Sequence, residues 1–354
     1  MTNQSLANST KKGWRLIIIG FAVLLILILL VFLFLQPRNQ KELLTAPSET
    51  PLPNPALLID PTASSVEATK NADPVSLPEP VPPTTIEQKP TIGSIRVSEI
   101  DDMEQVYIPA GEFLMGTNDV EAKREIIGGR AYPEIPQFSY FLDEFWIDKY
   151  EVTNKQYRDC MDAGACTDPH RIGSYSYPDY FSNPAYDHYP VVWVTWFQAT
   201  DYCKWVERRL PTEAEWEKAA RGIDGRKYPW GNDPYTEDKA NICDVNCTRT
   251  HRLPEFDDGY PDLAPVGSYP NGVSPYGALD MAGNAWEWNS TEIIDYPYDA
   301  NDGREDPGGI DIERGWRGSS WANGLWWLRS SVRYHALDFY SWYVLGFRCA
   351  ASAK

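Results

Sequence analysis

The sequence predicts an α+β domain with little regular secondary structure, which follows one membrane-spanning helix and a long disordered linker. Three observations support this: an apolar run near the N-terminus, a proline-rich stretch after it, and a tryptophan-rich remainder with threonine-capped helices and short strands. The expected boundaries are 1–15 for a cytoplasmic N-terminus, 16–35 for the transmembrane helix, 36–97 for the linker and 98–354 for the domain.

The apolar run Leu16–Leu35 is interrupted only by Gly20. Twenty helical residues rise about 30 Å, which is the thickness of the hydrocarbon core of a bilayer. Cleavable signal peptides have apolar cores of roughly 7–15 residues followed by small residues at the cleavage site. Here the run is longer, and Gln36-Pro37-Arg38 follows it. We therefore expect an uncleaved anchor; the alternative is an atypical signal peptide.

Charges and cysteines predict the orientation of this anchor. The basic residues that precede the run are Lys11, Lys12 and Arg15, and those that follow it are Arg38 and Lys41. By the positive-inside rule the N-terminus stays in the cytoplasm. All six cysteines lie in the C-terminal domain, and an even number is typical of disulfides in an oxidising compartment. Both observations favour an extracytoplasmic domain, periplasmic or at the cell surface; reduced core thiols are the alternative interpretation of the cysteines.

The linker and the overall charge limit the possible functions. Residues 37–92 contain twelve prolines and only scattered apolar side chains, too few to offset the entropy of ordering. We expect this stretch to be a spacer that holds the domain away from the membrane. The net charge of −18 argues against nucleic acid as a partner, because phosphate binding needs a basic face.

Within the domain, local patterns predict a few short elements. The expected strands are 105–109, 145–148 and 190–194. A capping box, in which a threonine and a Gln or Glu three residues later cap each other, marks a helix start. The three capping boxes are Thr153 with Gln156, Thr195 with Gln198, and Thr212 with Glu215. Almost no helical periodicity follows Ala220, so we expect loops and short strands there.

Several longer motifs, taken in their order and spacing, extend over the whole domain. They are Val106–Gly116 with Ile147–Asn154, Arg209–Glu217 with Tyr228–Gly231, and Gly277–Trp288 with Arg317–Trp321 and Leu345–Cys349. Together they resemble the formylglycine-generating-enzyme, or sulfatase-modifying factor, family. This resemblance implies the irregular, C-type-lectin-like α+β fold of that family.

The resemblance also bears on the cysteines. Cys160 and Cys166, and likewise Cys243 and Cys247, are close enough in sequence to form local disulfides. The two cysteines that remain are Cys203 and Cys349, and a bond between them is similar to a long-range bond in the family. A zinc site is the weaker alternative, because the cysteine spacing matches no zinc module.

Two calcium sites are implied by the same resemblance. Asn241 and Asp258 would give side-chain oxygens to the first, and Ile242 and Tyr260 backbone carbonyls. Asp280 and Glu287 would give carboxylates to the second, and Gly283 and Ala285 carbonyls. Oxygen-rich loops of this kind suit a hard cation, and we expect a structural role. The alternatives are that Asp258 only ends a turn and that Glu287 is an ordinary surface charge.

The copper-binding cysteine pair of the family's enzymes is missing. Asn323 and Leu328 occupy the two positions, and neither is a soft ligand for Cu(I). Val344 stands where the enzymes have a substrate-binding asparagine, whereas Ser320 is retained. No catalytic residue is therefore assigned and no copper is expected.

Aromatic and arginine side chains crowd the segment that forms the substrate groove in the family's enzymes. The candidate ligand-binding residues are Trp321, Asn323, Trp326, Trp327, Arg329, Arg333, Tyr334, Tyr340 and Trp342. Such residues offer large, rigid contact areas; the alternative is that about half of the aromatics are core and the rest seal loops. The leading hypothesis is a membrane-tethered, non-catalytic domain that binds a protein, peptide or glycan. The alternatives are an enzyme that modifies a protein or peptide by divergent chemistry and a structural component of an envelope assembly.

Overall fold

The computed structural model describes residues 89–119, 126–127, 130–131, 134–306 and 308–353. The predicted transmembrane helix at 16–35 and most of the predicted linker lie outside these residues. Within the described ranges, no helix is both long enough and apolar enough to cross a bilayer.

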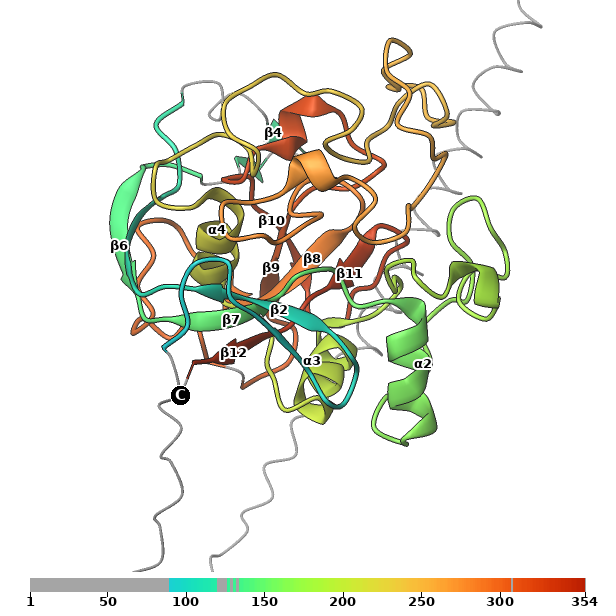
Figure 1. Cartoon of the computed structure of the whole chain (residues 1–354), viewed down its shortest axis with the longest axis horizontal. Helices are drawn as coiled ribbons and strands as arrows, with labels where there is room; N and C mark the ends of the chain where they lie inside the picture. Colours follow the sequence, from blue (N-terminus) through green and yellow to red (C-terminus); the bar gives the residue numbers. More distant parts are fainter. Residues whose placement is uncertain (1–88, 120–125, 128–129, 132–133, 307, 354) are drawn as a thin grey trace, which may run out of the picture. The chain divides into compact units, whose positions relative to one another are not determined.

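Two four-stranded sheets form the framework of the domain (Figure 1). The first has the order β1-β2-β7-β12, and its strands are β1 (Ile95–Val97), β2 (Glu104–Ile108), β7 (Phe145–Asp148) and β12 (Ala350–Ser352). The second has the order β10-β9-β8-β11, and its strands are β8 (Trp286–Glu292), β9 (Glu313–Arg317), β10 (Tyr334–Leu337) and β11 (Leu345–Phe347). Only the β11–β8 pair is parallel in these two sheets. Two-stranded sheets pair β3 (Gly111–Met115) with β6 (Phe138–Leu142) and β4 (Ile126–Ile127) with β5 (Arg130–Ala131).

Three α-helices begin at the predicted capping boxes, and both reciprocal hydrogen bonds of each box are present. These helices are α2 (Asn154–Asp162), α3 (Trp196–Trp205) and α4 (Glu213–Arg221). In the described part of the chain after α4 only short 3₁₀ turns occur, at η3 (Pro270–Gly272) and η4 (Leu325–Leu328); η2 (Pro184–Tyr186) precedes α3. The loop-rich second half was therefore predicted correctly.

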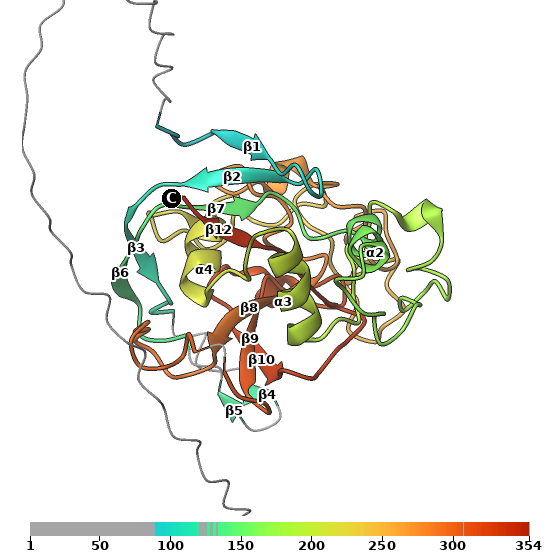
Figure 2. The same ribbon diagram turned by 90° about the horizontal axis from the view of Figure 1, so that it is seen from below.

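Helix α4 connects the two sheets. Its residues Trp216, Ala219 and Ala220 are fully buried against β2, β7 and β12. The indole Nε1 of Trp216 also donates to Glu287 Oε2 on β8, at 2.8 Å. Figure 2 shows α4 and α3 below the β1-β2-β7-β12 sheet, on the side where β8, β9 and β10 lie.

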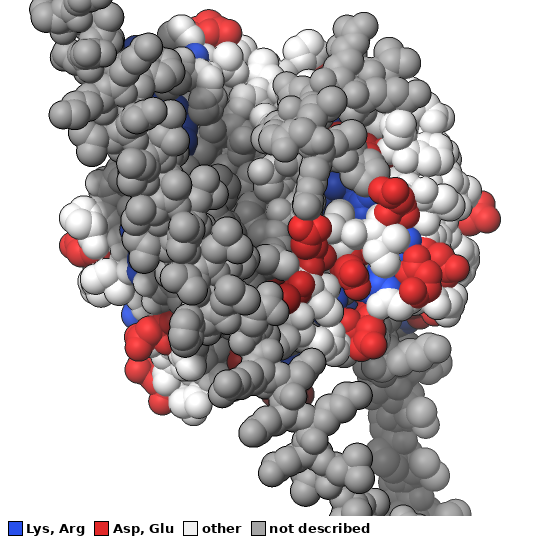
Figure 3. Space-filling view, turned by 180° about the vertical axis from the view of Figure 1, so that it is seen from behind, with Lys and Arg blue, Asp and Glu red and all other residues white. Residues whose placement is uncertain are grey.

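On the described part of the face in Figure 3, clusters of Asp and Glu surround a few Lys and Arg side chains.

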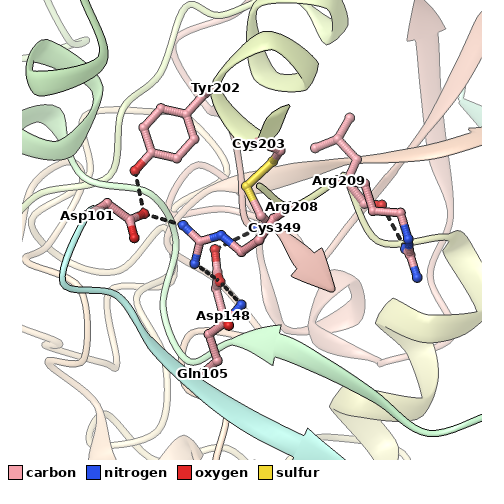
Figure 4. Close-up of a disulfide and its surroundings, with 9 residues drawn as sticks. Asp101, Gln105, Asp148, Tyr202, Cys203, Arg208, Arg209 and Cys349 are labelled. Atoms are coloured by element: carbon pink, nitrogen blue, oxygen red, sulfur yellow. Dashed lines mark hydrogen bonds and ion pairs between the residues drawn. A yellow bond between two sulfur atoms is a disulfide. The ribbon is translucent and has the colours of Figure 1, made fainter. Parts of the chain in front are cut away.

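The long-range disulfide Cys203–Cys349 joins α3 to the segment between β11 and β12 (Figure 4). Beside it Arg208 forms buried ion pairs with Asp101 and Asp148. Burial raises the pKa of Asp148 to about 6, and Arg208 opposes this shift. The other two disulfides are Cys160–Cys166 and Cys243–Cys247, so the three pairs are those expected.

Two sequence expectations differ from the structure. Strand β1 belongs to a sheet, because Ile95–Val97 pairs with β2, so the folded part begins before the expected boundary at 98. Residues 190–194 form no strand, although Val191 and Val194 are fully buried. Their backbone groups bond instead to separate segments: Val191 N donates to Val152 O, and Trp193 N donates to Trp342 O.

Candidate functional site

An aromatic cavity of about 660 Å³ lies where β8, β9 and β10 meet η4 and the loop before β11. Its volume is in the range of sites that bind small ligands or peptide side chains. The residues that line it are Arg249, His251, Trp286, Trp316, Ser320, Ala322, Asn323, Gly324, Leu325, Trp326, Trp327, Tyr334, Trp342, Tyr343 and Val344.

Neighbouring strands position the rings that line this cavity. Trp316 on β9 is paired in register with Tyr334 on β10, and their rings stack with centroids 5.2 Å apart. Trp286 on β8 lies 5.8 Å from Tyr334 and 6.0 Å from Trp327 on η4, between ring centroids. Because these rings are braced by sheet register and by one another, the aromatic surface is preorganised before any ligand arrives.

Asn323, the residue expected at the first copper-binding cysteine position, lies in the cavity wall. Its Oδ1 accepts hydrogen bonds from Ser320 Oγ at 2.7 Å and from Trp286 Nε1 at 3.0 Å. Leu328, the residue expected at the second cysteine position, is buried instead in an apolar cluster with Tyr235 and Ile242. Asn323 therefore accepts hydrogen bonds in the cavity wall, whereas Leu328 packs in the apolar core.

The structure places the predicted ligand-binding residues in two groups. Those that line the cavity are Asn323, Trp326, Trp327, Tyr334 and Trp342. The other four do not line it: Trp321 is a core residue, and Tyr340 is exposed and stacks on Trp316. Arg329 and Arg333 are buried because each forms a paired contact with a buried glutamate, Glu134 and Glu213 respectively. These two arginines pair within the fold and do not line the cavity, although Arg329 lies 4.1 Å from the ring centroid of Trp326, which does.

Ten residues of the cavity wall were not among the predicted ligand-binding residues, and six of these ten have polar or aromatic side chains. Trp286, Trp316, Ser320 and Tyr343 lie in or near recognised motifs, and strand alternation could have indicated the first two. Arg249 and His251 belong to the loop after the Cys243–Cys247 disulfide, and no local pattern predicts where that loop packs. The contact of His251 Nε2 with Ala322 O, at 2.9 Å, shows that this loop is attached to the cavity wall.

The donor set of the first predicted calcium site fits a cation. The Oδ1 atom of Asn241 is buried and accepts no hydrogen bond from any described residue. Asp258 lies beside it, because Asp258 Oδ2 accepts from the backbone N–H of Ile242 at 2.7 Å. Burial raises the pKa of Asp258 to about 7, the backbone N–H groups of Ile242 and Tyr260 oppose this shift, and the neighbouring Asp244 carboxyl adds to it. An orphan amide oxygen and an uncompensated carboxyl are the groups that a hard cation would satisfy.

At the second predicted site the carboxylates already have partners. Glu287 is fully buried and accepts from Arg348 Nε at 2.6 Å and Nη2 at 2.7 Å, so it is no surface charge. Asp280 Oδ2 accepts from the backbone N–H of Gly267 at 2.6 Å. Glu151 also lies nearby, and burial together with Asp280 raises its pKa well above the ordinary value. A cation there would have to share Glu287 with Arg348.

The remaining residues of the two predicted sets are those expected to supply backbone carbonyls. Tyr260 N donates to Asp258 Oδ1 at 3.1 Å, which closes the turn around that carboxyl. Gly283 and Ala285 are buried, and a Cβ at Gly283 would lie 2.3 Å from Asn241 O. The two predicted calcium sites are therefore adjacent, because Gly283 of the second lies against the backbone of Asn241 of the first. Within the described residues, no three His, Cys, Asp or Glu side chains gather as a metal site of their own.

Comparison with known proteins identifies the class. Residues 93–353 match the family model described as the sulfatase-modifying factor enzyme 1-like domain, and the chain belongs to this family. The formylglycine-generating enzyme of Bos taurus is 32% identical over 228 residues, which cover 53% of this chain and 57% of that protein. The inactive C-alpha-formylglycine-generating enzyme 2 of Mus musculus is 30% identical over 300 residues, which cover 73% of this chain and 89% of that protein.

Solved structures agree with the fold. PvdO from Pseudomonas aeruginosa superposes with a TM-score of 0.57 and 26% identity, covering 75% of this chain and all of that chain (100%). Treponema denticola variable protein 1 superposes with a TM-score of 0.52 at 21% identity, covering 76% of this chain and 100% of that chain. The second similarity concerns the fold alone.

The raised pKa of the Asp258 carboxyl allows the first calcium site to be tested by the pH dependence of stability. In the calcium-free protein its pKa rises from the ordinary 3.8 to about 7 on folding, so the free energy of unfolding should fall as pH rises through that window. Calcium should reverse this loss, stabilising by about 2.7 kcal/mol at a concentration a hundredfold above its Kd. Thermal unfolding of the calcium-stripped protein at pH 5 and pH 8, with and without added calcium, measures both effects.

The matched variants are Asp258→Asn and Glu255→Gln, the latter on an exposed residue of the same loop. Asp258→Asn should abolish the calcium response, whereas Glu255→Gln should keep it. An unfolding midpoint that does not respond to calcium at pH 8 in the unsubstituted protein would remove the site.

Proposed function

We propose that this chain is a membrane-tethered, extracytoplasmic member of its family that binds a protein, peptide or glycan without modifying it. The observation that supports binding is the preorganised aromatic cavity of about 660 Å³. Clustered Trp and Tyr side chains with a few polar groups are typical of recognition sites, because they supply large contact area at little entropic cost.

The state of the cysteines supports a role without formylglycine chemistry. All six cysteines belong to the described residues and form three disulfides, so none of them offers a thiolate to the cavity. Copper in its reduced state needs such ligands. Asn323 supplies an amide to the wall in place of a thiol, and Leu328 is buried outside it. The inactive mouse relative, similar over 73% of this chain, shows that the family includes non-catalytic members.

The tether, the calcium and the location complete the proposal. The apolar run Leu16–Leu35 would anchor the chain with its N-terminus in the cytoplasm. Three disulfides favour an oxidising compartment for the domain. Calcium at Asn241 and Asp258 would act structurally, by neutralising a buried carboxyl close to the loop that carries Arg249 and His251.

The proposed binding mode predicts that aromatic truncation removes affinity. Trp326→Ala combined with Trp327→Ala should weaken a binder selected from peptide or glycan libraries by about 30-fold or more, because central aromatic anchors contribute about 2 kcal/mol or more. Titration calorimetry with the full-length protein measures the loss. The control is Phe339→Ala, since Phe339 is half exposed in the same segment and does not line the cavity. Equal affinities for the two variants would rule out the cavity as the binding site.

A second test concerns the rival hypothesis of an enzyme. A Cys-x-Pro-x-Arg peptide incubated with the protein, copper and oxygen should keep its mass, whereas an active formylglycine-generating enzyme converts it in parallel. Mass spectrometry of the peptide provides the measurement. Formylglycine in the sample with this protein would contradict the non-catalytic assignment.

A further inference from the structure

A guanidinium that pairs with no carboxylate among the described residues lies at the edge of the aromatic cavity. The carbon of the Arg249 guanidinium is 5.0 Å from the ring centroid of Tyr175, 5.1 Å from that of Tyr343 and 5.8 Å from that of Trp321. These rings come from three separate segments of the chain, and they also contact one another at 5.4–6.0 Å. Cation–π contacts on three rings fix the position and plane of the positive charge.

The hydrogen-bonding capacity of Arg249 is unused within the described chain. No described carboxylate pairs with it, and its Nε is buried without a hydrogen bond. By contrast Arg317, Arg329 and Arg333 are all paired with buried glutamates. Buried donors without acceptors cost free energy, and an arginine fork matches a carboxylate in geometry and charge. Arg249 is therefore suited to an acceptor that arrives with a ligand.

The rest of the cavity wall restricts which ligand groups can lie next to a carboxylate bound by Arg249. Ser320 and Trp286 both donate to Asn323 Oδ1, and His251 is bonded to Ala322 O. Several polar groups of the wall are thus already bonded to each other, and the remaining surface is mostly aromatic faces. A sugar would need several polar partners for its hydroxyl groups, whereas an aromatic or large aliphatic side chain needs only apolar contact.

We propose that the cavity binds an acidic peptide. Arg249 holds a carboxylate, either of Asp or Glu or at the peptide C-terminus, and an adjacent aromatic or large aliphatic side chain packs against Trp327 and Trp342. This inference rests on the binding function proposed above and specifies its ligand. A basic peptide such as Cys-x-Pro-x-Arg would bring a positive charge toward Arg249 and is disfavoured.

The experiment uses a random peptide library with free C-termini, selected against the full-length protein. Selected peptides should share a carboxylate next to a large apolar residue. For one selected peptide, replacing the carboxylate by its amide should weaken binding about tenfold to a hundredfold, as measured by the fluorescence of the cavity tryptophans. In Arg249→Gln the two peptides should bind equally, because the carboxylate has lost its partner.

Arg252→Gln is the matched control, since Arg252 is exposed on the same loop and does not line the cavity. It should preserve the acid preference. Because the carboxylate is also removed on the peptide side, the result does not depend on the folding of any variant.

Three outcomes would overturn the proposal: enrichment of neutral or basic peptides, an unchanged acid preference in Arg249→Gln, or binding of a glycan array without any peptide enrichment. If neutral peptides or glycans are enriched instead, and the double variant Trp326→Ala with Trp327→Ala no longer binds them, the proposed binding function holds but the acidic-peptide ligand is wrong. If no library yields a binder, both fail.

Discussion

The Cys203–Cys349 disulfide is the constraint on which the rest of the structure depends. It joins α3 to the chain between β11 of one sheet and β12 of the other, across a sequence separation of 146 residues. In the chain-entropy model, closing a loop of this length lowers the conformational entropy of the unfolded chain, which stabilises the folded state by about 5 kcal/mol. Asp148 binds the same segment through the backbone N–H of Cys349, at 2.8 Å, and pairs with Arg208. The disulfide also leaves neither Cys203 nor Cys349 with a free thiol that could bind a metal.

The cavity follows from this framework. Because β8 and β9 are neighbours and β10 extends their sheet, Trp286, Trp316 and Tyr334 are held in fixed positions relative to one another. Trp286 and Trp316 belong to a large buried apolar cluster, and buried charged pairs such as Arg333 with Glu213 add to this packing. A loop-rich domain can keep a preorganised site in this way, since buried ion pairs and disulfides replace long helices and strands.

Local signals and family motifs predicted well, including the Cys203–Cys349 disulfide, whereas long-range contacts outside these motifs were missed. The capping boxes at Thr153, Thr195 and Thr212 predicted all three helix starts, because each box involves residues only three positions apart. Arg329 was predicted to face a ligand, because its partner Glu134 is 195 residues away and nothing near Arg329 indicates the pair. Arg249 was missed for the same reason: Tyr175, Trp321 and Tyr343 reach it from distant segments. The family and its fold were predicted from motifs, whereas the composition of the cavity needed the three-dimensional structure.

The most direct test of the account is a count of free thiols. The full-length protein, unfolded without reductant and treated with iodoacetamide, should gain no label on any of its six cysteines, as intact-mass and peptide mass spectrometry would show. Labelling of Cys203 and Cys349 would contradict the account, because it would leave two thiols available for metal chemistry and remove the bond that holds α3 to the C-terminal strands.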